Sequence, residues 1–136
     1  MRMLVISVLC LAAGCGGKDD SSGAGGSASP ATGPNARESV LEAWKKGGLQ
    51  PSAMTAATVP IGKDCQSGTV NNVDVVICQY ATAEEAKGGE KAGLEWVGAT
   101  TGAAWASGVV VIGAADRRKA DPSGRTINQL MKLAPK

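Results

Sequence analysis

The stretch CQSGTVNNVDVVIC, residues 65–78, constrains the fold more than any other part of the chain. Apolar and β-branched residues flank Asn71 and Asn72, and asparagine tolerates the positive φ angles of a two-residue hairpin turn. The pattern therefore predicts a β-hairpin that turns at the two asparagines. Counted outward from this turn, without reference to the cysteines, Cys65 lies opposite Cys78.

The two cysteines are placed for a disulfide bond. In this register they form a non-hydrogen-bonded pair, whose Cα atoms lie about 4.5 Å apart, at the short end of the range of roughly 4.4–6.8 Å for disulfides. A zinc site is disfavoured because the sequence contains no histidine and two cysteines are too few ligands. A redox pair is disfavoured because the spacing is not Cys-x-x-Cys. We predict a structural Cys65–Cys78 bridge worth about 3 kcal/mol, with free thiols as the remaining alternative.

Strand alternation sorts the side chains of the hairpin into two faces. One face is apolar and is expected to contact helices; it carries Val70, Val73, Val75 and Ile77. The other face is less apolar and carries Cys65, Ser67, Thr69, Asp74 and Cys78. The disulfide is therefore expected on the less apolar face.

The segment NARESVLEAWKKGG, residues 35–48, has the start and stop signals of a helix. Asn35 is a candidate N-cap, and the closing glycines end a helix. Val40, Leu41 and Trp44 share one face, which predicts that this helix packs on the core.

Residues 80–98 are predicted to form a second helix, with Thr82 and Glu85 as a capping box. Its apolar stripe is Ala83, Ala86, Leu94 and Val97. Glycines weaken a helix by about 1 kcal/mol each, so a helix broken near Gly88 is the alternative. The same glycines, at 88, 89 and 93, permit a close approach to the sheet.

The apolar run Val109 to Ile112 predicts an interior strand covered on both faces. Residues 121–136 predict a short last helix that Thr126 and Gln129 cap, with an apolar face of Ile127, Leu130, Met131 and Ala134. The predicted fold class is α+β: a small antiparallel sheet, made of the hairpin plus one further strand, with helices packed on one face. The predicted order is α-β-β-α-β-α.

The N-terminus combines Arg2 with a short apolar stretch that ends in small residues and Cys15. This stretch is too short to span a hydrocarbon core of about 30 Å and has the length of a signal-peptide apolar region. The segment LAAGC, residues 11–15, resembles the lipobox of bacterial lipoprotein signal peptides, although Ala12 stands where that family often has leucine. The resemblance implies that the signal peptide, 1–14, is removed and that Cys15 becomes the lipidated first residue.

The resemblance also implies a cellular location for the protein. It implies export and anchoring by acyl chains, at the periplasmic face of the inner or outer membrane or at the cell surface. Disulfides persist in such compartments. An ordinary secreted cysteine and a buried helix are the alternatives for this segment.

Residues 15–35 are rich in glycine and serine and have almost no large apolar side chains. This composition predicts a flexible tether that follows the lipidated cysteine. A nucleotide-binding loop is disfavoured because the glycine spacing matches no phosphate-binding pattern. The remainder, 36–136, is predicted to be a single α+β domain.

Signals for catalysis and cofactors are weak. The absence of histidine removes Ser–His and Cys–His pairs, and a net charge of +2 is too small to indicate a nucleic-acid binder. No cofactor and no metal are expected. The sequence places no two carboxylates on one rigid element in the arrangement that the paired acids of a glycosidase require. The candidate carboxylates are Asp64, Asp74, Glu84, Glu85, Asp116 and Asp121.

The loop after the buried strand, GAADRRKADPSGR, is the one candidate anion site. It gathers Arg117, Arg118, Lys119 and Arg125, and such a loop can hold a phosphate, a sulfate or a lipid headgroup. A solvated loop is the plainer alternative, because Asp116 and Asp121 dilute its charge. The tryptophans are expected in the core, with an exposed part of Trp96 or Trp105 as an alternative partner anchor.

These features favour a membrane-anchored envelope lipoprotein whose head is a non-catalytic binding or interaction module. Its expected partners are the membrane, through the lipid, and another envelope protein, the cell wall or a small ligand. The alternatives are a small extracytoplasmic enzyme and an anion or headgroup binder that uses the loop 116–125. The sequence leaves the oligomeric state open.

Overall fold

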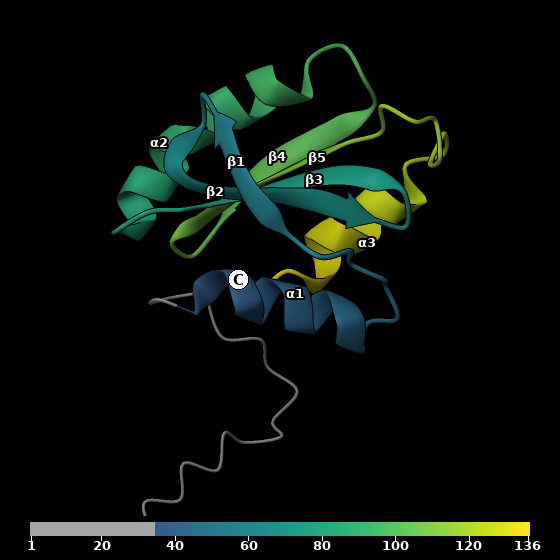
Figure 1. Cartoon of the computed structure of the whole chain (residues 1–136), viewed down its shortest axis with the longest axis horizontal. Coiled ribbons are helices and arrows are strands. Elements are labelled where there is room, and N and C mark those ends of the chain that lie inside the picture. The colour runs from purple at the N-terminus through teal and green to yellow at the C-terminus, as the bar shows by residue number, and fades with distance from the viewer. Residues whose placement is uncertain (1–34) are drawn as a thin grey trace, which may run out of the picture.

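The computed structural model describes residues 35–136, which form three helices and a five-stranded antiparallel sheet (Figure 1). The elements are α1 (Ala36–Lys46), β1 (Thr55–Val59), β2 (Gly62–Val70), β3 (Val73–Gln79), α2 (Ala83–Val97), β4 (Gly102–Ser107), β5 (Val110–Ala115) and α3 (Arg125–Leu133). The strand order is β1-β2-β3-β5-β4. The predicted signal peptide, the predicted lipidation site Cys15 and the predicted tether up to residue 34 lie outside the described residues.

The α+β class with a small antiparallel sheet is confirmed, but the expected number of strands was wrong. The structure adds β1 and β4 at the two edges of the sheet. Their sequences, TAATV and GAAWAS, have little of the apolar alternation that marks a strand. They are strands because their backbones pair with β2 and β5, a tertiary effect that outweighs local propensity.

The β2–β3 hairpin is confirmed with its register. Asn71 and Asn72 have φ angles of 49° and 68°, as the two-residue turn requires. Cys65 pairs with Cys78, and their sulfur atoms are bonded with the Cα atoms 4.0 Å apart. The structural disulfide is therefore present at the predicted place.

The apolar face of the hairpin contacts α1 and α3, as expected. Val70, Val73, Val75 and Ile77 are fully buried against a core that both helices share. Trp44 of α1 is also fully buried, and its indole N–H donates to the carbonyl oxygen of Leu130 over 3.0 Å.

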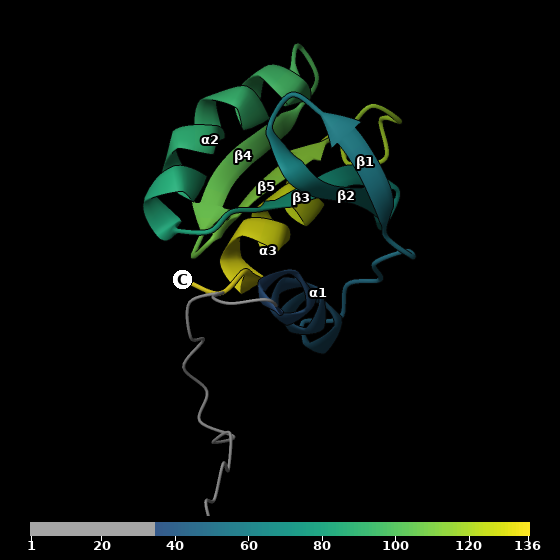
Figure 2. The same cartoon turned by 60° about the vertical axis from the view of Figure 1, so that its left-hand side comes forward.

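The expectation that all helices cover one face was wrong. Figure 2 shows α2 on the opposite side of the sheet from α1 and α3. There α2 packs mainly on β4 and β5, over a smaller cluster that contains the disulfide. This position explains why every residue of β5 is buried, in agreement with a strand covered on both faces.

The helix α2 is continuous, so the break near Gly88 does not occur. Its buried residues are Ala86, Gly89, Gly93 and Val97. The predicted stripe was partly wrong, because Ala83 is exposed and Leu94 is 54% exposed. A Cβ atom on Gly93 would lie 2.8 Å from the Cβ atom of Ala104, so glycine lets this helix approach the sheet closely.

The helix caps agree with the sequence in part. The Thr82 hydroxyl accepts from the backbone N–H of Glu85 over 3.2 Å, as predicted, whereas Asn35 occupies the N-cap of α1 without a side-chain bond. Thr126 was wrongly expected to cap the last helix, because α3 already begins at Arg125. Met131 was wrongly placed on the buried face and is 41% exposed.

None of the helices within residues 35–136 is long and apolar enough to cross a lipid bilayer.

Candidate functional site

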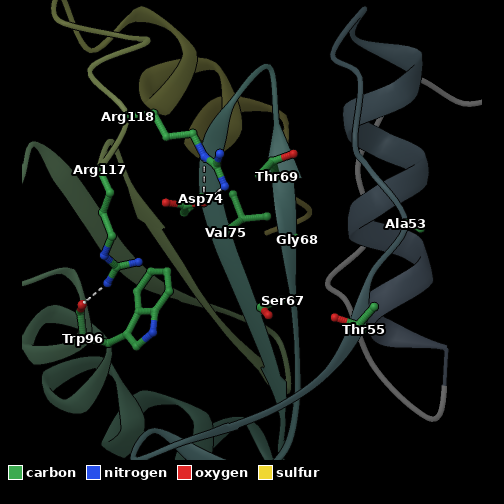
Figure 3. Close-up of a pocket in the computed structure, with 10 residues that line it drawn as sticks. All are labelled: Ala53, Thr55, Ser67, Gly68, Thr69, Asp74, Val75, Trp96, Arg117 and Arg118. Carbon is green, nitrogen blue, oxygen red and sulfur yellow. Dashed lines mark hydrogen bonds and ion pairs between the residues drawn. The ribbon is translucent and has the colours of Figure 1, made fainter.

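An open groove lies on the α2 side of the sheet, beside the part that α2 covers, and is lined by residues from β1 and the segment before it, from β2 and β3, from the end of α2 and from the loop after β5 (Figure 3). Its volume is 380 Å³, within the range of about 300–1,000 Å³ that is usual for small-molecule sites. Its lining residues are Ala53, Thr55, Ser67, Gly68, Thr69, Asp74, Val75, Trp96, Arg117 and Arg118. Below, "the groove" means the space bounded by these residues.

The strand register explains the polar floor of the groove. Thr55 pairs with Ser67, and Thr69 pairs with Asp74, so these four side chains lie on the same face of the sheet as the disulfide. Within residues 35–136, no protein group hydrogen-bonds to the hydroxyls of Thr55, Ser67 or Thr69. These hydroxyls therefore remain as donors and acceptors for a ligand.

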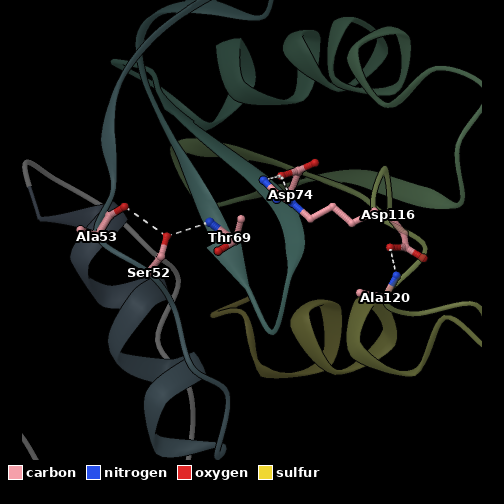
Figure 4. Close-up of polar contacts among 7 residues, drawn as sticks. Ser52, Ala53, Thr69, Asp74, Asp116 and Ala120 are labelled. Atoms are coloured by element: carbon pink, nitrogen blue, oxygen red, sulfur yellow. Dashed lines mark hydrogen bonds and ion pairs between the residues drawn. The ribbon is translucent and has the colours of Figure 1, made fainter.

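Ser52, in the segment before β1, is hydrogen-bonded to Thr69 of β2 (Figure 4). The Ser52 hydroxyl accepts from the backbone N–H of Thr69 over 2.9 Å. The backbone N–H of Ser52 donates to the carbonyl oxygen of Thr69 over 2.7 Å. These two bonds hold Ala53 and Thr55 beside the groove.

Trp96 and Arg117 form the opposite side of the groove (Figure 3). The guanidinium carbon of Arg117 lies 4.1 Å from the centroid of the indole ring, a cation–π contact. The same guanidinium donates from Nη2 to the carbonyl oxygen of Trp96 over 2.6 Å. A Cβ atom on Gly113 would lie 3.0 Å from the indole, so this glycine leaves room for the ring against β5.

Arg118 is the second guanidinium of the groove. Its Nε and Nη2 atoms both lie 3.3 Å from Oδ1 of Asp74. The Arg118 side chain is 60% exposed, and that of Asp74 is 20% exposed. A pair this exposed contributes only about 0–1 kcal/mol to stability, and it favours the direction in which the guanidinium lies beside Asp74.

Asp116 and Asp121 organise the loop that carries both arginines. The Asp116 carboxylate accepts from the backbone N–H of Ala120 over 2.7 Å (Figure 4). It also accepts from the backbone N–H of Asp121 over 2.9 Å. Asp121 accepts from the backbone N–H of Ile127 over 3.0 Å, in the first turn of α3. Both aspartates are buried, so their charges stabilise the loop and its helix start instead of facing the groove.

The structure separates the four cations of the predicted anion site. Arg117 and Arg118 line the groove, whereas Lys119 and Arg125 are exposed outside its lining. The backbone N–H at the start of α3 that such a site would use is taken by Asp121.

Sequence reasoning missed most of the groove. Thr55 was missed because its strand has no apolar pattern, and Ser67 and Thr69 were placed on the correct face without a role. Trp96 was expected either in the core or as a partly exposed anchor for a partner. In the structure it packs on the smaller core cluster and also lines the groove. Trp105 packs on the larger cluster.

Within residues 35–136, no three aspartate, glutamate or cysteine side chains gather as a metal site. Comparison of the chain with models of protein families, with curated proteins and with solved structures finds no match.

Proposed function

We propose that this protein is a bacterial envelope lipoprotein, held on a membrane by acyl chains on Cys15, whose head binds a small ligand in the groove without transforming it. The lipobox-like LAAGC segment supports the anchor. The observation that carries the binding role is the groove itself, where an indole, two guanidiniums and three hydroxyls without protein partners converge.

The position of the groove supports the same proposal. The chain enters the head at α1, on the side of the sheet opposite α2 (Figures 1 and 2). The groove lies on the α2 side, so it opens away from the side at which the chain enters.

The arrangement of charges favours binding over catalysis. Asp74 is the one carboxylate among the residues that line the groove, and it is paired with Arg118. The Asp74 carboxylate is already engaged by the Arg118 guanidinium through Oδ1. The groove therefore offers recognition groups to a ligand.

The anchor is tested by metabolic labelling of the full chain with an alkyne analogue of palmitate in a bacterial host. We expect label and membrane retention for the natural chain, and uncleaved, unlabelled precursor for Cys15→Ala. Cys10→Ala is the matched control and should be labelled normally, because residue 10 lies within the expected signal peptide. Labelling of Cys15→Ala would contradict the anchor.

The binding role is tested with the lipidated full chain in detergent, dialysed against mixed small solutes of the bacterial envelope. We expect the natural chain to enrich at least one solute with its mass unchanged, and the Trp96→Ala/Arg118→Gln variant to lose this enrichment. A solute recovered with altered mass would indicate an enzyme. Equal enrichment by the variant would place binding outside the groove.

A further inference from the structure

We propose that the groove binds a sugar acid, that is, a single hydroxylated ring that carries one carboxylate. This inference rests on the proposed binding function and names the ligand class for the same groove. It is drawn from the charge, the hydroxyls, the indole and the volume of the groove.

The charge of the groove calls for one negative charge on the ligand. Among the lining residues, Arg117 and Arg118 are cationic and Asp74 is anionic, which leaves one positive charge uncompensated. A carboxylate supplies one negative charge at neutral pH, whereas a phosphate monoester carries about −1.5 to −2. The balance therefore favours a carboxylate.

Both guanidiniums are already oriented without a ligand. Arg117 is held by the indole face and the carbonyl oxygen of Trp96, and Arg118 is held by Asp74. Each guanidinium has five N–H donors, and these contacts occupy only some of them. Donors that are oriented in advance bind a carboxylate with a smaller loss of side-chain entropy.

The rest of the groove suits a hydroxylated ring. Thr55, Ser67 and Thr69 present hydroxyls across the groove from Trp96 (Figure 3), and a hydroxyl both donates to and accepts from the hydroxyls of a sugar. Arg117 covers one face of the indole, and the rest of the indole is left as apolar surface for the C–H groups of the ring. A volume of 380 Å³ is near the lower end for binding sites, which suits one ring.

The probe is D-glucuronic acid, titrated calorimetrically into the lipidated full chain in detergent. D-glucose and D-glucosamine provide the neutral and cationic versions of the same ring, and glucose 1-phosphate provides the phosphate version. We expect glucuronate to bind about tenfold or more tightly than glucose and glucosamine, because only glucuronate among these three forms a charge-assisted pair. We also expect it to bind more tightly than glucose 1-phosphate, whose second negative charge finds no uncompensated cation among the lining residues.

Two arginine variants show whether glucuronate binds in the groove or is attracted only by the overall positive charge of the protein. Arg118→Gln should weaken glucuronate binding about tenfold or more. Arg125→Gln removes the same charge from an exposed position outside the groove, so it should leave the affinity within about twofold. Thermal unfolding of both variants shows whether each is folded.

A second experiment shows whether the natural ligand is a free sugar acid or the headgroup of a glycolipid. It measures binding of the protein to phosphatidylcholine vesicles that contain glucuronosyl diacylglycerol. Binding of free glucuronate alone assigns a soluble or cell-wall sugar acid, and tighter binding to these vesicles assigns a glycolipid headgroup. Both results support the sugar-acid class.

The proposal is overturned if glucose or glucose 1-phosphate binds as tightly as glucuronate, or if glucuronate shows no saturable binding. It is also overturned if Arg125→Gln weakens binding as much as Arg118→Gln. If the dialysis experiment still recovers an unchanged, groove-dependent solute, the binding function stands and only its ligand class is wrong.

Discussion

The two faces of the sheet are built differently. The face under α1 and α3 is closed by large apolar side chains, among them the fully buried Trp44, Ile77 and Leu130. The face under α2 has a smaller cluster, a disulfide and a helix whose glycines contact the strands, and part of it stays open as the groove. One face is thus a closed apolar core, whereas the other face combines a smaller core and the disulfide with an open groove that carries polar groups.

The sharpest way to break this comparison is to remove one tryptophan from each face. Trp44→Ala should lower the free energy of unfolding by about 3–5 kcal/mol, because a fully buried ring and its bond to Leu130 are lost. Trp96→Ala should cost only about 1–2 kcal/mol, because its ring is partly exposed. Urea unfolding followed by circular dichroism measures both; equal losses would mean that the two faces stabilise the fold alike.

The disulfide should provide the next largest effect, as the covalent support of the face with the smaller core. The double variant Cys65→Ala/Cys78→Ala should lose about 3 kcal/mol of unfolding free energy. Reductant should destabilise the natural chain by a similar amount and leave the variant unchanged. Peptide mapping of unreduced, exported protein that found both cysteines as free thiols would contradict this prediction.

Much of the first face and of the hairpin could be predicted from the sequence because their signals are local. The Asn71–Asn72 turn fixes the register, and the register places Cys65 against Cys78. The edge strand that carries Thr55 could not be predicted, because its sequence, TAATV, lacks the apolar alternation that marks a strand, although its partner β2 follows directly in the chain.

The contact between α2 and the sheet escaped prediction for a related reason. Apolar periodicity identifies a buried helix face by its large side chains, whereas here glycines form much of that face and Leu94 points to solvent. The groove depends on the end of this helix, on a loop arginine pair and on strand hydroxyls. No single stretch of sequence contains that combination.

A pair of glycine substitutions in α2 sharpens this point. Gly93→Ala should destabilise the protein by about 1–3 kcal/mol, because its Cβ atom would lie 2.8 Å from the Cβ atom of Ala104. Gly88→Ala is the matched control: apart from the backbone of its own helix, no atom lies within 4 Å of its added Cβ, so it should stabilise the helix by up to about 1 kcal/mol. Thermal unfolding that ranks the two in the opposite order would refute close packing of α2 on the sheet.

The smallest expected effect concerns alkaline pH on the α2 side. Tyr80 donates to the carbonyl oxygen of Ile61, and burial raises the pKa of its phenol above the usual value near 10. Its neutral form is thus favoured in the folded state. The resulting stability is fully present below the unfolded pKa and is lost as the pH rises through the folded pKa.

Tyr80 is the single tyrosine of the sequence, so phenolate absorbance reports its titration alone. We expect a midpoint above that of the urea-unfolded chain, and we expect Tyr80→Phe to remove this part of the alkaline destabilisation. A folded midpoint at or below the unfolded one would contradict the prediction.

The central claim, that the α2 side binds a ligand while the opposite face only supports the fold, is tested most directly by ¹H–¹⁵N spectra of the full chain titrated with D-glucuronic acid. The account predicts saturable shifts at Thr69, Asp74 and the indole N–H of Trp96, with the indole N–H of Trp44 unmoved. Shifts centred on α1 and α3 would contradict it, and an unchanged spectrum would contradict the sugar-acid ligand class.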